Sequence, residues 1–194
     1  MPVKQYSHIF FDLDNTLWDF TRNTYYALRA AFHKHIRSGD HRIGYNSFFN
    51  CYCNINQSLW KDYHNQLIQK KELTQLRFRK TFEEFNITGV DAAEMNSTYL
   101  SEMPKQTHLI DGTIEILDYL KSAGYQMSII SNGFREVQFK KIENAGIQNY
   151  FTKVFLSEDV KIPKPGYGIF EYAVKSSNAR KSSSLMVGDN WEVD

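Results

Sequence analysis

Short apolar segments that run into polar turns constrain this chain more than any other feature. The first is Ile9-Phe10-Phe11, which leads directly into Asp12-Leu13-Asp14-Asn15-Thr16, a turn rich in carboxylates. A short apolar run without polar alternation predicts a strand that is buried on both faces, as in a parallel sheet. Since open α/β sheets bind ligands beyond the carboxyl ends of their strands, this turn is predicted to lie at a binding site.

The chain after Pro104 repeats this alternation of strand and helix. We expect helices over 111–123, 135–145 and 165–176, and strands over 125–130, 153–156 and 185–187. Gly124 and Gly146 are placed to end the first two helices, and Pro165 suits the first turn of the third. Parallel strands joined by helical crossovers predict an α/β fold with a doubly wound parallel sheet.

The segment 18–105 has a different pattern. Glycine is scarce, no proline occurs before Pro104, and apolar residues recur at helical spacing, as in Tyr25, Leu28, Phe32 and Ile36. This spacing predicts an all-helical insertion of three to five helices. We therefore expect a discontinuous α/β core over 1–17 and 106–194, interrupted by a helical domain over 18–105.

The last residue, Asp194, follows closely on a predicted strand. A parallel sheet of this kind normally continues with another helix and another strand. We therefore expect the natural protein to extend beyond Asp194.

Composition limits the classes of partner. The 194 residues carry a net charge of +1, which gives no electrostatic reason to expect a nucleic acid or an anionic membrane. The longest apolar runs are too short to span a membrane, and the N-terminus has no secretory h-region. Cys51 and Cys53 imply no disulfide framework. We expect a cytoplasmic protein that acts on a small molecule, and the sequence leaves its oligomeric state open.

The polar residues after the strands are suited to phosphoryl transfer. Asp12 is the candidate nucleophile, because attack by a carboxylate divides one difficult displacement into two easier ones. Asp14 is the candidate general acid and base, which protonates the leaving oxygen and then deprotonates the attacking water. Lys164 supplies a compact positive charge that neutralises both the nucleophile and the bound phosphate.

Phosphate-binding groups and a metal ion complete the expected site. The Ser131 hydroxyl and the main-chain N–H groups of Asn132 and Gly133 can bind phosphate oxygens at the start of a helix. Two carboxylates beside a phosphate require a cation, and Mg²⁺ suits a site made of oxygen ligands. The candidate metal ligands are Asp12, Asp14 and Asp189, with Asp194 supporting them.

Each of these patterns is common by itself, but in this order the sequence resembles the haloacid dehalogenase superfamily. Its four motifs correspond to Phe10 to Leu17, Ile130 to Gly133, Lys164-Pro165 with Ile169-Phe170, and Gly188 to Asp194. The motifs extend from residue 10 to the last residue. The resemblance implies a Rossmann-like core with a helical cap inserted after the first motif, in agreement with the helical block described above.

A finer resemblance concerns the cap. Leu59 to Tyr63 and Arg77-Phe78, with Ser131 to Phe134 in the core, resemble the pyrimidine 5′-nucleotidase branch, which acts on nucleoside monophosphates. One position departs from the pattern: the glycine that usually precedes the third-motif lysine by three residues is Lys161. Lys161 and Lys164 therefore compete for the phosphate role, and the spacing to the following proline and phenylalanine favours Lys164.

Substrate selection is expected to come from residues around the cap. Trp18 and Phe20 follow the first motif, and an aromatic ring there either stacks on a nucleobase or packs the cap against the core. Arg77 and Arg79 either reach a substrate or are solvated on a helix surface, and solvation is favoured.

Other functions use overlapping motifs. A sugar-phosphate phosphatase or a phosphoglucomutase-like isomerase would share all four. A haloacid dehalogenase lacks the second aspartate, so Asp14 argues against that chemistry. An inactive binding protein would be expected to lack Asp12, Asp14, Lys164 or Asp189, and all four are present. We therefore predict a Mg²⁺-dependent phosphoric monoester hydrolase, with a nucleoside monophosphate as the expected substrate.

Overall fold

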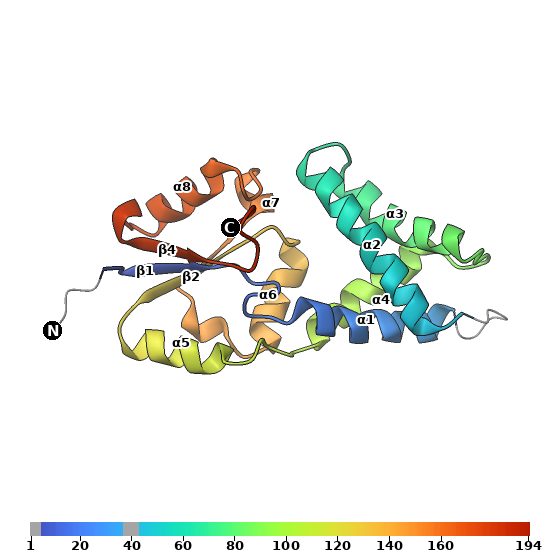
Figure 1. Ribbon diagram of the computed structural model, residues 1–194, viewed down its shortest axis with the longest axis horizontal. Coiled ribbons are helices and arrows are strands. Elements are labelled where there is room, and N and C mark those ends of the chain that lie inside the picture. Colours follow the sequence, from blue (N-terminus) through green and yellow to red (C-terminus); the bar gives the residue numbers. More distant parts are fainter. Residues whose placement is uncertain (1–4, 37–42) are drawn as a thin grey trace. The chain divides into compact units, whose positions relative to one another are not determined.

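The chain folds into two compact units, described here from a computed structural model that covers residues 5–36 and 43–194 (Figure 1). The core unit consists of the residues up to Asn23 together with Thr107–Asp194, and the helical unit consists of Thr24–Gln106. From the sequence alone, these boundaries are expected slightly earlier, after residues 17 and 105.

Four parallel strands form the sheet of the core unit. They are β1 His8–Phe11, β2 Gln126–Ser131, β3 Lys153–Leu156 and β4 Ser184–Val187. Their order across the sheet is β3-β2-β1-β4, so the chain moves outward from β1 to β3 and then returns to the other side of β1. The carboxyl ends of β1 and β4 therefore flank the topological switch point, where doubly wound folds bind their ligands. The predicted α/β fold with a doubly wound parallel sheet is confirmed.

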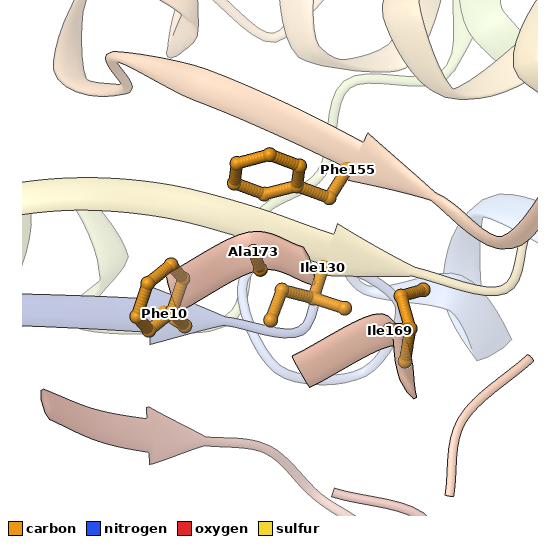
Figure 2. Close-up of a cluster of buried hydrophobic side chains, with 5 residues drawn as sticks. All are labelled: Phe10, Ile130, Phe155, Ile169 and Ala173. Atoms are coloured by element: carbon orange, nitrogen blue, oxygen red, sulfur yellow. The ribbon is translucent and has the colours of Figure 1, made fainter. Parts of the chain in front are cut away.

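Helices cover both faces of this sheet. α5 Thr113–Ser122 and α6 Arg135–Asn144 lie on one face, and α8 Tyr167–Ser176 lies on the other (Figure 1). Five buried side chains fill the space between the sheet and α8, namely Phe10, Ile130, Phe155, Ile169 and Ala173 (Figure 2). Burying each large apolar side chain contributes roughly 1.5–3 kcal/mol, so this layer holds β1, β2 and β3 firmly under α8.

Glycines end two helices of the core unit as the sequence predicts. After α5, the Gly124 N–H donates to Lys121 O and the Tyr125 N–H donates to Leu120 O, while Gly124 adopts a φ of 74°. This pair of hydrogen bonds is the Schellman motif, which requires a left-handed residue. Gly146 ends α6 in the same way.

Two details of the core unit differ from the prediction. α8 begins at Tyr167, so the placement of Pro165 in its first turn is wrong; Pro165 lies in the preceding loop, after a cis peptide bond. A short helix, α7 Ser157–Val160, follows β3 and has no counterpart among the predicted elements. Four residues are too few to display a helical period in the sequence. Short 3₁₀ segments, η2 Gln148–Tyr150 and η3 Lys181–Ser183, precede β3 and β4.

The helical unit has no strand within the part of the chain that the structure describes. Its elements are α1 Phe20–His35, whose first turn belongs to the core unit, α2 Tyr45–His64, α3 Lys70–Glu84, α4 Ala92–Glu102 and the 3₁₀ segment η1 Met103–Lys105. Aromatic rings form its centre: the centroid of Tyr52 lies 5.0 Å from that of Phe78 and 5.6 Å from that of Tyr99. None of the described helices is both long and apolar enough to cross a membrane.

Arg77 belongs to this aromatic centre, so the expectation that it is solvated is wrong. It is only 2% exposed. Its Nε donates to Asn96 Oδ1 at 3.1 Å, and its guanidinium carbon lies 5.0 Å from the ring centroid of Tyr99. The helical period explains the difference, because Arg77 falls on the stripe of α3 that includes the buried Leu73, whereas Arg79 falls outside it and is exposed.

Candidate active site

Asp12 is the first residue beyond β1, and the sheet fixes its position. Phe11 pairs with Val187 of β4, and the Asp12 N–H donates to Val187 O at 2.9 Å. The Thr16 hydroxyl donates to Asp12 Oδ2 at 3.3 Å. Asp12 is only 7% exposed. The structure therefore holds this carboxylate at the switch point between β1 and β4.

Lys164 lies directly against Asp12. Its Nζ donates to Asp12 Oδ1 at 2.6 Å and also to Asp194 Oδ1. The side chain of Asn132 holds the main chain of Lys164: Asn132 Nδ2 donates to Lys164 O at 3.0 Å, and the Lys164 N–H donates to Asn132 Oδ1 at 2.8 Å. Lys161 is exposed. Of the two competing lysines, Lys164 is the one that contacts Asp12.

Burial makes the Asp12 carboxylate costly to ionise. Loss of solvation raises its pKa from 3.8 to about 6; Lys164 opposes this rise, and the charges of Asp14 and Asp194 add to it. Burial also raises the pKa of Asp189. Dehydrated carboxylates that crowd one another are stabilised by a nearby cation.

Three carboxylates converge at this point. Oxygens of Asp12, Asp189 and Asp194 all lie within 4.8 Å of one another. Asp194 returns toward Asp189 through a turn in which its N–H donates to Asn190 O at 2.8 Å. Gly188 leaves room for it, because a Cβ there would lie 2.1 Å from Asp194 Oδ2. Converging carboxylate oxygens are the donors that Mg²⁺ prefers, so these residues fit the ion.

The Asp14 carboxylate lies outside this group and turns toward α6. Lys141 Nζ donates to Asp14 Oδ1 at 2.7 Å, and Gln138 Nε2 donates to Asp14 Oδ2 at 2.9 Å. Neither α6 residue is among the candidates from the sequence. A signal was nevertheless present: both are polar residues on the stripe of α6 that also contains the buried Val137 and Ile142. Polar side chains on a buried stripe need a partner.

Ser131 ends β2, and its hydroxyl oxygen accepts two hydrogen bonds. One comes from Gln138 Nε2 at 2.7 Å and the other from the Gly133 N–H at 3.2 Å. Since a hydroxyl has two acceptor sites, its hydrogen remains to be donated to a third group. Gly133 permits this packing, because a Cβ there would lie 2.3 Å from Gln138 Nε2.

Trp18 is fully buried, which removes it as a stacking surface for a nucleobase. Its ring instead contacts Lys141, whose Nζ lies 4.1 Å from the ring centroid. The Phe20 centroid lies 5.3 Å from the same nitrogen. Cations are attracted to the face of an aromatic ring, so these two side chains help to hold Lys141.

Comparison with known proteins identifies the family. The sequence model of the haloacid dehalogenase-like hydrolases matches residues 9–192, which contain Asp12, Asp14, Lys164 and Asp189. The chain belongs to this family. The predicted resemblance to the haloacid dehalogenase superfamily is confirmed.

Several relatives of this haloacid dehalogenase-like hydrolase are phosphatases. Pyrimidine 5′-nucleotidase YjjG of Escherichia coli K12 is 31% identical over 188 residues, which cover 96% of this chain and 78% of the relative. Glyceraldehyde 3-phosphate phosphatase of Pyrococcus abyssi is 30% identical over 191 residues, which cover 96% of this chain and 74% of the relative. The predicted enzyme class, a phosphoric monoester hydrolase, is confirmed.

A solved structure shares the fold. The HAD-hydrolase YfnB from Bacillus subtilis, crystallised with bound magnesium, superposes with a TM-score of 0.86 at 26% identity. The match covers 98% of this chain and 83% of that one. The Rossmann-like core and the helical cap are thus those of a haloacid dehalogenase-like hydrolase.

Proposed function

We propose that this hydrolase is a Mg²⁺-dependent 5′-nucleotidase that cleaves nucleoside monophosphates, with a preference for pyrimidines, through an aspartyl-phosphate on Asp12. One observation carries the proposal: Lys164 Nζ lies 2.6 Å from Asp12 Oδ1, beside the converging Asp189 and Asp194 carboxylates. A fixed cation at that place neutralises the nucleophile and attracts the phosphate that it attacks.

In the first half-reaction an oxygen of Asp12 attacks phosphorus and forms a new P–O bond. The ester P–O bond breaks, and its electron pair leaves with the ester oxygen, which takes the proton of Asp14. The nucleoside departs as an alcohol, and Asp14 is left as a carboxylate.

In the second half-reaction water attacks the phosphorus of the aspartyl-phosphate. Asp14 accepts a proton from that water, and the P–O bond to Asp12 breaks with its electron pair returning to the Asp12 carboxylate. Inorganic phosphate leaves, and both aspartates regain their starting protonation states.

The phosphate oxygens are bound by groups around the end of β2. The proposed donors are the Ser131 hydroxyl, Lys164 Nζ and the main-chain N–H groups of Asn132 and Gly133. Ser131 has its hydrogen to donate, whereas the Gly133 N–H would exchange its present bond to Ser131 Oγ for one to phosphate.

Mg²⁺, when bound, supplies positive charge that offsets the carboxylates and the phosphate. Its proposed ligands are the carboxylates of Asp12 and Asp189 and the main-chain carbonyl of Asp14, with Asp194 next to them. The Asp14 side chain is assigned to proton transfer because Gln138 and Lys141 turn it away from the other carboxylates.

The substrate class rests on similarity. The 31% identity with a pyrimidine 5′-nucleotidase supports a nucleotide, and the 30% identity with glyceraldehyde 3-phosphate phosphatase makes a sugar phosphate the second candidate. A dehalogenase displaces halide from carbon and protonates no leaving group, so it would give the anchored Asp14 carboxylate no role.

Phosphate release from pyrimidine and purine nucleoside monophosphates and from sugar phosphates tests the proposal. The assay uses Mg²⁺ or EDTA, with Asp12→Asn beside the unaltered chain. We expect Mg²⁺-dependent release, highest with pyrimidine monophosphates, and loss of about 10³-fold or more in Asp12→Asn. Release centred on sugar phosphates would replace the substrate assignment, and an active Asp12→Asn would reject the covalent step.

A further inference from the structure

Lys141 is a charged side chain placed in the interior of the core unit. Its side chain is 3% exposed, whereas that of its carboxylate partner Asp14 is 26% exposed. Lysines are almost never this deeply buried unless they are paired. The proposed function assigns a role to Asp14 and none to Lys141, so the burial of this lysine needs a reason of its own.

The contacts of Asp14 fix the plane of its carboxylate. Oδ1 accepts from Lys141 Nζ at 2.7 Å and Oδ2 accepts from Gln138 Nε2 at 2.9 Å. Two donors on two different oxygens restrict rotation of the carboxylate more than one donor does. Gln138 and Lys141 are three residues apart on α6, which puts them on one face of the helix.

The turn that carries Asp14 also holds the lysine in place. Asp14 and Trp18 form a bridge within this turn, and the Trp18 ring lies 4.1 Å from Lys141 Nζ. Lys141 is therefore held between the carboxylate and the ring of one turn. Any movement of the carboxylate away from this position would separate a buried charge from its partner.

Gln138 connects Asp14 with the expected phosphate-binding hydroxyl. Its Nε2 donates to Asp14 Oδ2 and to Ser131 Oγ at 2.7 Å. The same amide packs on Gly133, where a Cβ would come within 2.3 Å. One amide thus sets the distance between the proton donor and the group that holds the phosphate.

We propose that Gln138 and Lys141 are positioning residues that orient the Asp14 carboxylate for proton transfer to the leaving oxygen and from the attacking water. This assignment rests on the proposed function, in which Asp14 is the general acid and base. Misplacing a catalytic group by about 1 Å can cost on the order of 10²-fold in rate, so the pair is expected to act on turnover.

Leaving-group dependence separates positioning from a structural role. A nucleoside leaves as an alkoxide and needs the proton of Asp14, whereas 4-nitrophenolate is stable as an anion and needs it little. We expect Lys141→Met and Gln138→Leu to lower kcat/KM for a nucleoside monophosphate by about 10–100-fold, and for 4-nitrophenyl phosphate by less than about 3-fold. With 4-nitrophenyl phosphate, kcat should fall and a burst of nitrophenol should appear, because the second half-reaction also needs Asp14.

Three comparisons accompany these variants. Lys140→Met removes an exposed lysine from the neighbouring position of α6 and should leave both substrates unaffected. Asp14→Asn should show the same discrimination between substrates in a stronger form. Thermal unfolding of each variant monitors folding, and the ratio of the two kcat/KM values is independent of the fraction folded.

The outcomes distinguish a failure of the positioning role from a failure of the proposed function. If Asp14→Asn discriminates between the two substrates but the α6 variants lose activity equally with both, or lose none, the positioning role is overturned. If Asp14→Asn itself lacks discrimination, the general acid of the proposed function is wrong and the positioning assignment falls with it. Discrimination in all three variants would support both.

Discussion

The core unit and the helical unit each bury positive charge, but they do so with different partners. In the core unit, Lys164 and Lys141 meet the carboxylates of Asp12 and Asp14 at 2.6 and 2.7 Å. In the helical unit, Arg77 meets the amide oxygens of Asn56 and Asn96 and the faces of aromatic rings.

The two kinds of partner differ in what their own burial costs. Lys164 holds a carboxylate that is itself costly to bury, as the raised pKa of Asp12 indicates. Arg77 fills space between helices. Its partners are neutral amide oxygens and aromatic rings, which bind the guanidinium without bringing negative charges together. The ionised Asp12 carboxylate therefore lowers the stability of the folded state, whereas the contacts of Arg77 raise it. Four changes test this comparison.

The largest effect is expected at Arg77. Arg77→Ala would leave a cavity, and it would leave the buried amide oxygen of Asn56 and the part-buried one of Asn96 without their donor, so it should lower the free energy of unfolding by about 3–5 kcal/mol. Arg79→Ala, at an exposed position of the same helix, should change it by less than about 0.5 kcal/mol. Urea denaturation measures both, and similar values for the two would show that Arg77 is no part of the packing.

At Asp12, by contrast, a substitution is expected to raise the free energy of unfolding. In metal-free buffer at pH 8, Asp12→Asn should raise the free energy of unfolding by up to about 3 kcal/mol, because two pKa units correspond to that energy. The folded-state pKa is raised to about 6 from 3.8, so the folded chain binds this proton more tightly than the unfolded chain.

The pH dependence of this gain in stability follows from the raised pKa of Asp12 in the folded chain. Below pH 4 Asp12 is protonated in both states and its burial costs little; the cost grows between pH 4 and 6 and is complete above pH 6. The gain from Asp12→Asn should therefore shrink toward zero as the pH falls to 4. Glu143→Gln, at an exposed position of α6, serves as the control. A gain that is independent of pH would contradict the assignment to ionisation.

A smaller loss is expected at Gly188. Gly188→Ala puts a methyl group 2.1 Å from Asp194 Oδ2, so Asp194 must move and the unfolding free energy should fall by about 1–3 kcal/mol. The Mg²⁺ concentration that half-maximally raises the melting temperature should also increase. Gly44→Ala is the control for the Mg²⁺ response, because its Cβ would meet nothing within 4 Å and it lies at the start of α2 in the helical unit. An unchanged Mg²⁺ response would remove Asp194 from the proposed metal group.

The smallest effect is expected at Lys161, which adopts a left-handed φ of 63° after α7. Lys161→Gly relieves that conformation, and after the entropy cost of glycine it should add about 0.5–1 kcal/mol to the unfolding free energy. Lys175→Gly, inside α8, should instead remove about 1 kcal/mol. A loss of stability in Lys161→Gly would show that its backbone carries no strain.

Local sequence determines much of the core unit. The apolar run before Asp12 forms β1, and the glycines after α5 and α6 supply the left-handed residues that end them. These features depend on neighbours in the chain, so spacing and residue type predict them. Asp12, Asp14 and Asp189 could be chosen for the same reason, since each follows a predicted strand, and Lys164 from its spacing to the following proline and phenylalanine.

Tertiary structure decides where the side chains of those residues point. Spacing already favours Lys164 over Lys161, but the position of Lys164 depends on Asn132, which lies in a different loop and binds the main chain of the lysine. The division between the Asp12, Asp189 and Asp194 group and the separate Asp14 depends on α6, about 125 residues further along the chain. The burial of Trp18 likewise follows from neighbours that only the fold supplies.

The sequence by itself therefore determined the parallel sheet, the helical insertion and the chemical groups at the strand ends, because these follow from local periodicity and connection rules. Only the tertiary structure decided which carboxylates converge, how Lys164 is held against Asp12, and which side chains anchor the Asp14 carboxylate. Such pairings join residues far apart in the chain, and their energies depend on burial and distance, which sequence spacing does not encode.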